Sequence, residues 1–117
     1  MSKPTLYHNP RCSKSRQALE LLRARGVEPE IVEYLKTPPD AHQLEQILVM
    51  LGLEPRQLMR TNEPEYKENS LGDDSLNRGQ LIRAMVEHPR LIQRPILINE
   101  GSAVLGRPPE AVLEILA

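Results

Sequence analysis

The spacing of hydrophobic residues changes several times along this chain of 117 residues. Residues 5–7 form a short apolar run after Pro4, and the run breaks at Asn9-Pro10, as a buried strand does where it enters a loop. From Ser13 to about Gly26 the apolar positions follow a helical stripe, and residues 30–34 then alternate between polar and apolar. This order predicts a βαβ unit with two parallel strands and a right-handed crossover.

The middle of the chain is typical of a helical segment. Residues 41–51 carry an apolar stripe that stops before Gly52, and a short helical turn is expected at residues 54–59. A further helix is predicted to begin between Asp74 and Asn77 and to end near His88-Pro89. Residues 60–74 are polar and irregular, which predicts a loop that folds over another part of the protein.

The last quarter of the chain predicts two strands and a helix. Residues 94–99 are nearly all apolar, as in an interior strand, and a tight turn at Glu100-Gly101 leads into residues 102–105 as an antiparallel hairpin. Residues 106–110 hold two prolines and open a final helix. The whole pattern predicts a single α/β domain over residues 1–117, with a mixed four-stranded sheet and flanking helices.

Composition removes several classes of function. The net charge is −1 and aromatic residues make up 3% of the chain, so no basic surface or stacking platform for nucleic acid is expected. No apolar run approaches the roughly 20 residues that a membrane-spanning helix needs. The N-terminus leads into a strand rather than a signal peptide, so we expect a cytoplasmic protein.

Cys12 is the only cysteine of the chain. It cannot form an internal disulfide, and the three histidines show no metal-ligand spacing with it, so no metal site is expected. It falls at the predicted start of the first helix. No acidic residue precedes Glu20, whereas four cations do: Lys3, Arg11, Lys14 and Arg16. Cationic neighbours and a helix N-terminus lower the pKa of a thiol, so the sequence predicts a reactive cysteine that handles an anion.

The residues after Cys12 limit the thiol chemistry. A phosphatase loop needs an arginine six positions later, where this chain has Ala18, and a dithiol motif needs a second cysteine at Ser15. A Cys/His protease would require a distant histidine and an amide, which one sequence cannot show. The interpretation that remains is a single nucleophilic thiol that an external thiol regenerates.

Three residues near Cys12 are candidates for tuning its thiolate. His8 at the end of the first strand can place a hydrogen bond or a charge near the sulfur, or it can be an ordinary strand-end histidine. Ser15 can donate to the thiolate or satisfy backbone donors in the first helical turn. Arg16 can act on the thiolate charge, or, like Lys14, be a solvated helix residue.

Three arginines stand where a loop meets a predicted element: Arg60, Arg94 and Arg107. The planar guanidinium group suits oxyanions because it offers paired, charge-assisted hydrogen bonds. The ordinary alternatives are a helix C-cap for Arg60 and surface charges for the other two. Hydrophobic periodicity cannot bring the three together in space.

Four separated motifs together resemble one known family. They stand in the same order in this sequence: His8-Asn9-Pro10-Arg11-Cys12 with Ser15-Arg16, Leu58-Met59-Arg60, Arg94-Pro95-Ile96, and Gly106-Arg107-Pro108-Pro109-Glu110. Over essentially its whole length the chain resembles the glutaredoxin-coupled arsenate reductase (ArsC) family. Ser13-Lys14 follows the cysteine where the reductase motif has Gly-Thr, which resembles a less characterised branch of that family.

The resemblance implies a thioredoxin-like fold with an inserted helical segment, and a mechanism. Cys12 would attack arsenate or a similar oxyanion, with His8 and Ser15 tuning the thiolate. The oxyanion and the arsenylated cysteine would be held by Arg60, Arg94 and Arg107. Glutathione would act as co-substrate and glutaredoxin as resolving partner, with no tightly bound cofactor. The resemblance also implies a cis peptide bond before Pro95.

Two alternatives remain at this point. One is a glutathione-dependent monothiol oxidoreductase that acts on another substrate, such as another oxyanion or a glutathionylated protein. The same superfamily also includes redox-linked transcription regulators that bind RNA polymerase. Those regulators usually sense through a cysteine pair, and Ser15 stands where the second cysteine would be.

Overall fold

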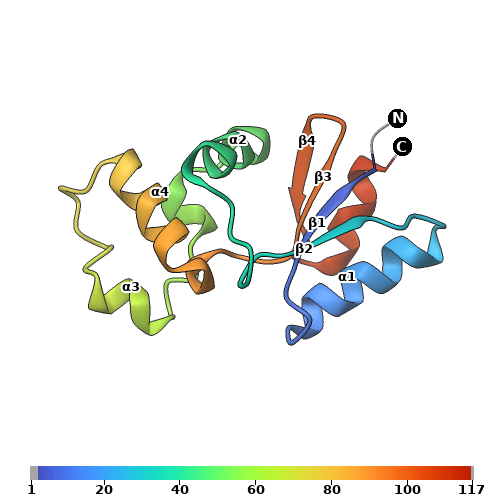
Figure 1. Cartoon of the computed structure of the whole chain (residues 1–117), viewed down its shortest axis with the longest axis horizontal. Helices are drawn as coiled ribbons and strands as arrows, with labels where there is room; N and C mark the ends of the chain where they lie inside the picture. The colour runs from blue at the N-terminus through green and yellow to red at the C-terminus, as the bar shows by residue number, and fades with distance from the viewer. Residues whose placement is uncertain (1–2, 117) are drawn as a thin grey trace. The chain divides into compact units, whose positions relative to one another are not determined.

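A computed structural model describes residues 3–116 of the chain. The chain forms two compact units, each described here by itself (Figure 1). One consists of Met1–Thr37 together with Arg94–Ala117, and the other is the continuous segment Pro38–Gln93. The second unit is therefore an insertion in the first, as the family resemblance implies.

The first unit contains a mixed four-stranded sheet with the strand order β2-β1-β3-β4. The strands are β1 (Thr5–His8), β2 (Glu30–Glu33), β3 (Ile96–Asn99) and β4 (Ser102–Leu105). β1 pairs in parallel with β2 and antiparallel with β3, and β3 forms a hairpin with β4. The predicted βαβ unit, the interior position of β3 and the C-terminal hairpin are thus confirmed.

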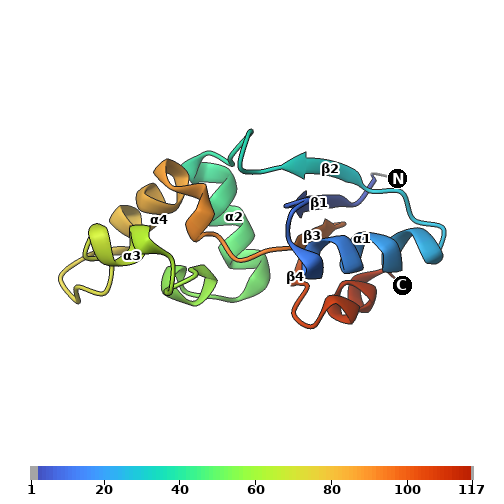
Figure 2. The same cartoon turned by 90° about the horizontal axis from the view of Figure 1, so that it is seen from below.

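Two helices cover this sheet. α1 (Ser13–Ala24) and the 3₁₀ helix η3 (Pro109–Ile115) pack against each other and against the strands (Figure 2). The core between them is aliphatic, as the absence of Phe and Trp requires: Leu6, Ala18, Leu22, Leu97 and Val112. Burying a Leu or Val side chain stabilises a fold by about 1.5–3 kcal/mol, so this cluster fixes the start of α1 relative to the sheet.

The second unit is helical. Its elements are α2 (Ala41–Leu51), η1 (Pro55–Leu58), α3 (Pro64–Glu68), α4 (Arg78–Glu87) and η2 (Pro89–Leu91). α2 and α4 pack together through aliphatic side chains and both begin with a capping box, at Asp40 and Asn77. These caps explain why both boundaries lie close to the predicted ones.

One prediction for local structure was wrong, and the last predicted helix is confirmed with a tighter geometry. Residues 60–74 are not entirely loop, because α3 lies within them; this short helix buries no residue and so has no apolar stripe to reveal it. The final helix is a 3₁₀ helix that begins only at Pro109, consistent with the tighter geometry common in short helical segments. Within residues 3–116, no helix has the length and apolar character needed to cross a membrane.

Candidate active site around Cys12

Cys12 lies at the N-cap of α1, directly after the loop that leaves β1. Its backbone N–H donates to the carbonyl of Asn9 over 3.0 Å, and its own carbonyl accepts from the N–H of Arg16 over 3.0 Å. The thiol is free and partly exposed. Its side chain does not satisfy the criteria of a capping hydrogen bond, but the first amide groups of the helix point toward the sulfur and stabilise negative charge on it.

The pKa of the Cys12 thiol lies below its ordinary value. Burial is the largest single influence and acts in the opposite direction, but the other influences together outweigh it. These are the backbone amides of Ser15 and Lys14 and the guanidinium of Arg94, which all favour the thiolate. The site therefore favours the nucleophilic form of the sulfur, as the sequence predicts.

Behind the cysteine lies a buried polar cluster, made of His8 (6% exposed), Asn9 (8%) and Ser15 (0%). His8 Nδ1 and Ser15 Oγ are joined by a hydrogen bond of 2.6 Å, and the backbone N–H of Asn9 donates to the same oxygen over 3.0 Å. The hydroxyl of Ser15 is thus bonded to His8 and Asn9, and Ser15 acts on the thiol through its backbone amide. These bonds join the end of β1 to the first turn of α1.

His8 is neutral near pH 7. Burial is the main cause that lowers the pKa of its imidazole; Glu33 opposes this, and Arg23 and Arg16 add to it. A neutral imidazole adds no positive charge near the sulfur. Its observed contact is the hydrogen bond to Ser15, and a tuning role for His8 stays a prediction.

The Ser15 hydroxyl yields the first testable prediction. Ser15→Ala leaves His8 Nδ1 and the Asn9 N–H buried without their partner, which is expected to lower the free energy of unfolding by about 1–3 kcal/mol. Urea denaturation measures this loss. The matched control is Ser13→Ala, an exposed position at the start of the same helix, where a change within about 0.5 kcal/mol is expected. Equal losses in both variants would contradict a structural role of the buried hydroxyl.

Arg94 and Arg107 lie in the same unit as Cys12. Arg107 Nε donates to the carbonyl of Arg94 over 3.1 Å, and the N–H of Gly106 donates to the carbonyl of Pro95 over 2.8 Å. The Arg94–Pro95 bond is cis, as the resemblance implies, and so is the Arg107–Pro108 bond, which the sequence did not suggest. The loop after β4 is thereby fastened to the segment that enters β3.

The other two candidate arginines have different surroundings. Arg60 lies in the helical unit, where it forms an ion pair with Glu63 over 3.3 Å, and its role at Cys12 stays a prediction. Arg16 is exposed and donates to the carbonyl of Pro10 over 2.9 Å, so it fastens the loop that leads to the cysteine. Its proposed influence on the thiolate also stays a prediction.

Sequence reasoning missed Tyr34. This residue follows β2, is 1% exposed, and has a pKa raised to about 12, chiefly by burial. The Cys12 sulfur also raises this pKa, whereas the guanidinium of Arg94 and the amide of Asn9 lower it, so all three lie close to the phenol. No local pattern in the sequence could have found it, because only the parallel register, which pairs His8 with Glu33, places the next residue, Tyr34, beside Asn9.

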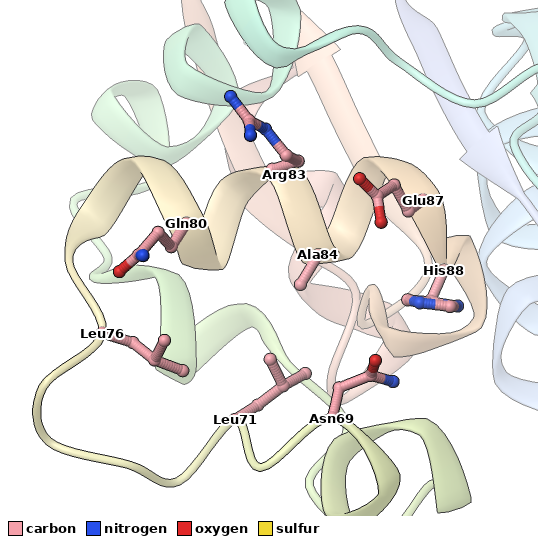
Figure 3. A pocket seen from close by; sticks show the side chains of 8 residues that line it. All are labelled: Asn69, Leu71, Leu76, Gln80, Arg83, Ala84, Glu87 and His88. Atoms are coloured by element: carbon pink, nitrogen blue, oxygen red, sulfur yellow. The ribbon is translucent and has the colours of Figure 1, made fainter.

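Two cavities lie near elements described above. One of about 220 Å³ is formed by the β1–α1 loop, including Arg11, and by Leu35 and Lys36 after β2. The other, of about 180 Å³, belongs to the helical unit; Figure 3 shows Ala84, Leu71 and Leu76 facing it, while Arg83 extends from the other side of α4. Cys12 lines neither of these two cavities, so neither cavity by itself is the candidate active site.

The fold, with a single cysteine at the N-terminus of α1, is that of a thioredoxin-like protein. Residues 7–115 match the model of the ArsC family, and the chain belongs to this family.

Individual relatives agree with this assignment. An arsenate reductase of Neisseria meningitidis serogroup B is 46% identical over 112 residues, which cover 95% of this chain and 96% of that protein. The uncharacterized protein YfgD of Escherichia coli K12 is 55% identical over 95% of this chain and 94% of its own length. The solved structure of an arsenate reductase from Vibrio cholerae has a TM-score of 0.95 and 50% identity, covering 97% of this chain and 98% of that one.

Proposed function

We propose that this chain is an arsenate reductase that uses Cys12 as its nucleophile, with glutathione and glutaredoxin as reductants. The observation that carries the proposal is the position of the only thiol, partly exposed at a helix N-terminus, with a lowered pKa and Arg94 beside it. The similarity to arsenate reductases supports arsenate as the substrate. Cytosolic thiols are kept reduced by glutathione and thioredoxin systems, so the proposed reaction belongs in the cytoplasm.

The proposed reaction balances in four steps. The Cys12 thiolate attacks arsenic(V), a sulfur–arsenic bond forms, and one arsenate oxygen leaves as water after protonation. The glutathione thiol then bonds to arsenic and displaces a second oxygen as water. A glutaredoxin thiol attacks the glutathione sulfur, the sulfur–arsenic bond breaks, and its electron pair reduces arsenic(V) to arsenic(III). Hydrolysis releases arsenite and the Cys12 thiol, and the two electrons come from the glutathione and glutaredoxin thiols, which are oxidised to a mixed disulfide.

The residues of the first unit suit the first step. The amides of Lys14 and Ser15 at the start of α1 and the guanidinium of Arg94 stabilise negative charge at the sulfur, and an arsenate oxygen bound there would meet the same groups. Arg107 is exposed and tied through Nε to the Arg94 carbonyl, which leaves its terminal nitrogens available to a second oxygen. A contact between Arg60 and the oxyanion stays a prediction from the family resemblance.

A coupled assay tests this proposal. With glutathione, glutaredoxin, glutathione reductase and NADPH present, the reduced protein is expected to give NADPH oxidation that depends on arsenate. Omission of either glutaredoxin or glutathione should abolish the NADPH oxidation. A flat trace with fully reduced protein, in an assay where a known arsenate reductase works, would contradict the assignment.

The exposed Ser13-Lys14 pair favours one second candidate. It places another cation in the first turn of α1, where the reductase motif has small residues, so the same thiol would suit a glutathione-dependent oxidoreductase acting on another substrate. Mass spectrometry of Cys12 after incubation with arsenate or with oxidised glutathione separates the two. Only one of the two incubations should leave a stable adduct on Cys12, and a glutathione adduct without turnover of arsenate favours the second candidate.

A further inference from the structure

Tyr34 and Arg94 come to Cys12 from opposite sides of β1. The parallel register pairs His8 with Glu33, so Tyr34 follows β2 at the end where β1 leads into the Cys12 loop. The antiparallel register pairs Tyr7 with Ile96, so Arg94, two residues earlier, approaches the same end from β3. The two side chains therefore meet where β1 ends, although they are 60 positions apart in the sequence.

Both side chains carry a buried polar atom without a partner. Tyr34 Oη and Arg94 Nε are inaccessible to solvent, and among residues 3–116 neither atom has a partner at full hydrogen-bond geometry, although the Arg94 guanidinium and the Asn9 amide lie close enough to the phenol to lower its pKa. Buried polar groups in native proteins are hydrogen-bonded in the large majority of cases, so each of these two atoms requires an explanation. Their chemistry is complementary, because Nε–H is a donor only and the phenol oxygen has lone pairs that accept.

We propose that Tyr34 is a positioning residue whose hydroxyl oxygen accepts the Nε–H of Arg94, directly or through one buried water, and so holds the guanidinium against the Cys12 sulfur. The inference rests on the proposed function only in taking Cys12 as the nucleophile. Tyr34 Oη is buried and so acts through Arg94 without touching the substrate. The raised pKa of the phenol keeps it neutral at physiological pH, so it adds no negative charge that would oppose the thiolate.

Hydrogen bonds already hold the main chain at Arg94, so it is the orientation of the guanidinium that requires the hydrogen bond to Tyr34. The Arg94 carbonyl is held by Arg107 Nε, and Pro95 is held through its own carbonyl by the Gly106 N–H. These bonds anchor the main chain and leave the orientation of the long side chain open. Without the phenol oxygen, Nε–H has no buried acceptor, and the guanidinium gains by turning towards water.

The test is Tyr34→Phe, read as the pH dependence of alkylation of Cys12 by iodoacetamide. As the only thiol, Cys12 gives an unambiguous rate, and below its pKa this rate follows the thiolate fraction. One net hydrogen bond corresponds to about a two- to tenfold change in an equilibrium, so the rate at pH 6.5 is expected to fall by that factor. The limiting rate at high pH should stay unchanged. Tyr66→Phe, the same change in the helical unit, is the matched control and should leave the whole profile unaltered.

A double-mutant cycle shows whether Tyr34 acts through Arg94. Arg94→Met removes every donor, so adding Tyr34→Phe to it should change the alkylation profile no further. An unchanged profile in Tyr34→Phe, or an equal effect of this substitution with and without Arg94, would overturn the inference. Circular dichroism of each variant verifies the fold.

A measurement on the unsubstituted protein gives an independent answer. The Nε–H of Arg94 should exchange slowly with solvent in NMR spectra, because it is buried and bonded, and fast exchange would also overturn the inference. None of these measurements needs arsenate. A protein that fails to reduce arsenate yet shows the Tyr34 effect would refute the proposed function alone.

Discussion

Replacement of Cys12 with serine is expected to lower arsenate reduction on the order of a thousandfold or more in the coupled assay. Cys12 is the only thiol, and a serine hydroxyl stays protonated at the pH where the Cys12 thiolate forms, so no bond to arsenic replaces the sulfur–arsenic bond. Residual activity above about a tenth of the original rate would show that another group is the nucleophile.

The same substitution should not damage the fold. Cys12 occupies an N-cap position where its sulfur makes no capping hydrogen bond, and serine is among the best N-cap residues. The free energy of unfolding is therefore expected to stay the same or to rise by up to about 1 kcal/mol. Urea denaturation beside the activity assay separates loss of chemistry from loss of structure, and a clear destabilisation would contradict this account of the N-cap.

Replacement of Gly106 with alanine is expected to lower the free energy of unfolding by about 1–3 kcal/mol. A Cβ atom at this position would lie 2.6 Å from Pro95 Cγ and 3.2 Å from Val112 Cγ1. Neither neighbour yields easily, because the proline ring is rigid and both residues are buried. Gly106 does not have a positive φ, so the cost arises from crowding and not from backbone strain.

The Gly106 substitution should also disturb the site. Gly106 donates to the Pro95 carbonyl and precedes Arg107, whose Nε holds the Arg94 carbonyl, so displacement of Pro95 moves the arginine that favours the thiolate. The alkylation rate of Cys12 near pH 6.5 should therefore fall as well.

Gly79→Ala is the matched control. A Cβ at Gly79, in α4, meets only Asn77 Oδ1 at 3.5 Å, and alanine is favoured over glycine in helices by up to about 1 kcal/mol. The midpoint of denaturation should thus fall for Gly106→Ala and should rise or stay unchanged for Gly79→Ala. A Gly106→Ala variant as stable as the parent protein would show that the contact with Pro95 relaxes freely.

The site combines two sources of positive potential that act on one sulfur. The amides at the start of α1 are a property of any helix N-terminus, whereas the guanidinium of Arg94 is specific to this fold. Burial of the thiol works against both, and a fully buried cysteine here would lose its thiolate character. The partly exposed position of Cys12 therefore suits both ionisation and access by an anion.

Most of the elements are predictable from local sequence. The apolar stripe of α1, the alternation in β2 and the capping residues Asp40 and Asn77 each act within a few positions along the chain, so their signals survive without any tertiary information. α3 shows the limit of this reasoning. It buries no residue, so hydrophobic spacing carried no trace of it.

The candidate site likewise has one part that the local sequence determines and one part that depends on the tertiary structure. Cys12 at the start of a helix, among cations and without a second cysteine, is determined by consecutive residues, and with it the chemistry of a single thiol. The meeting of Arg94, Tyr34 and Asn9 at that thiol, and the pairing of the Ser15 hydroxyl with His8, depend on tertiary structure. The physical reason is that strand register and core packing join positions far apart in the chain, and no local pattern of residues records which strand ends will lie side by side.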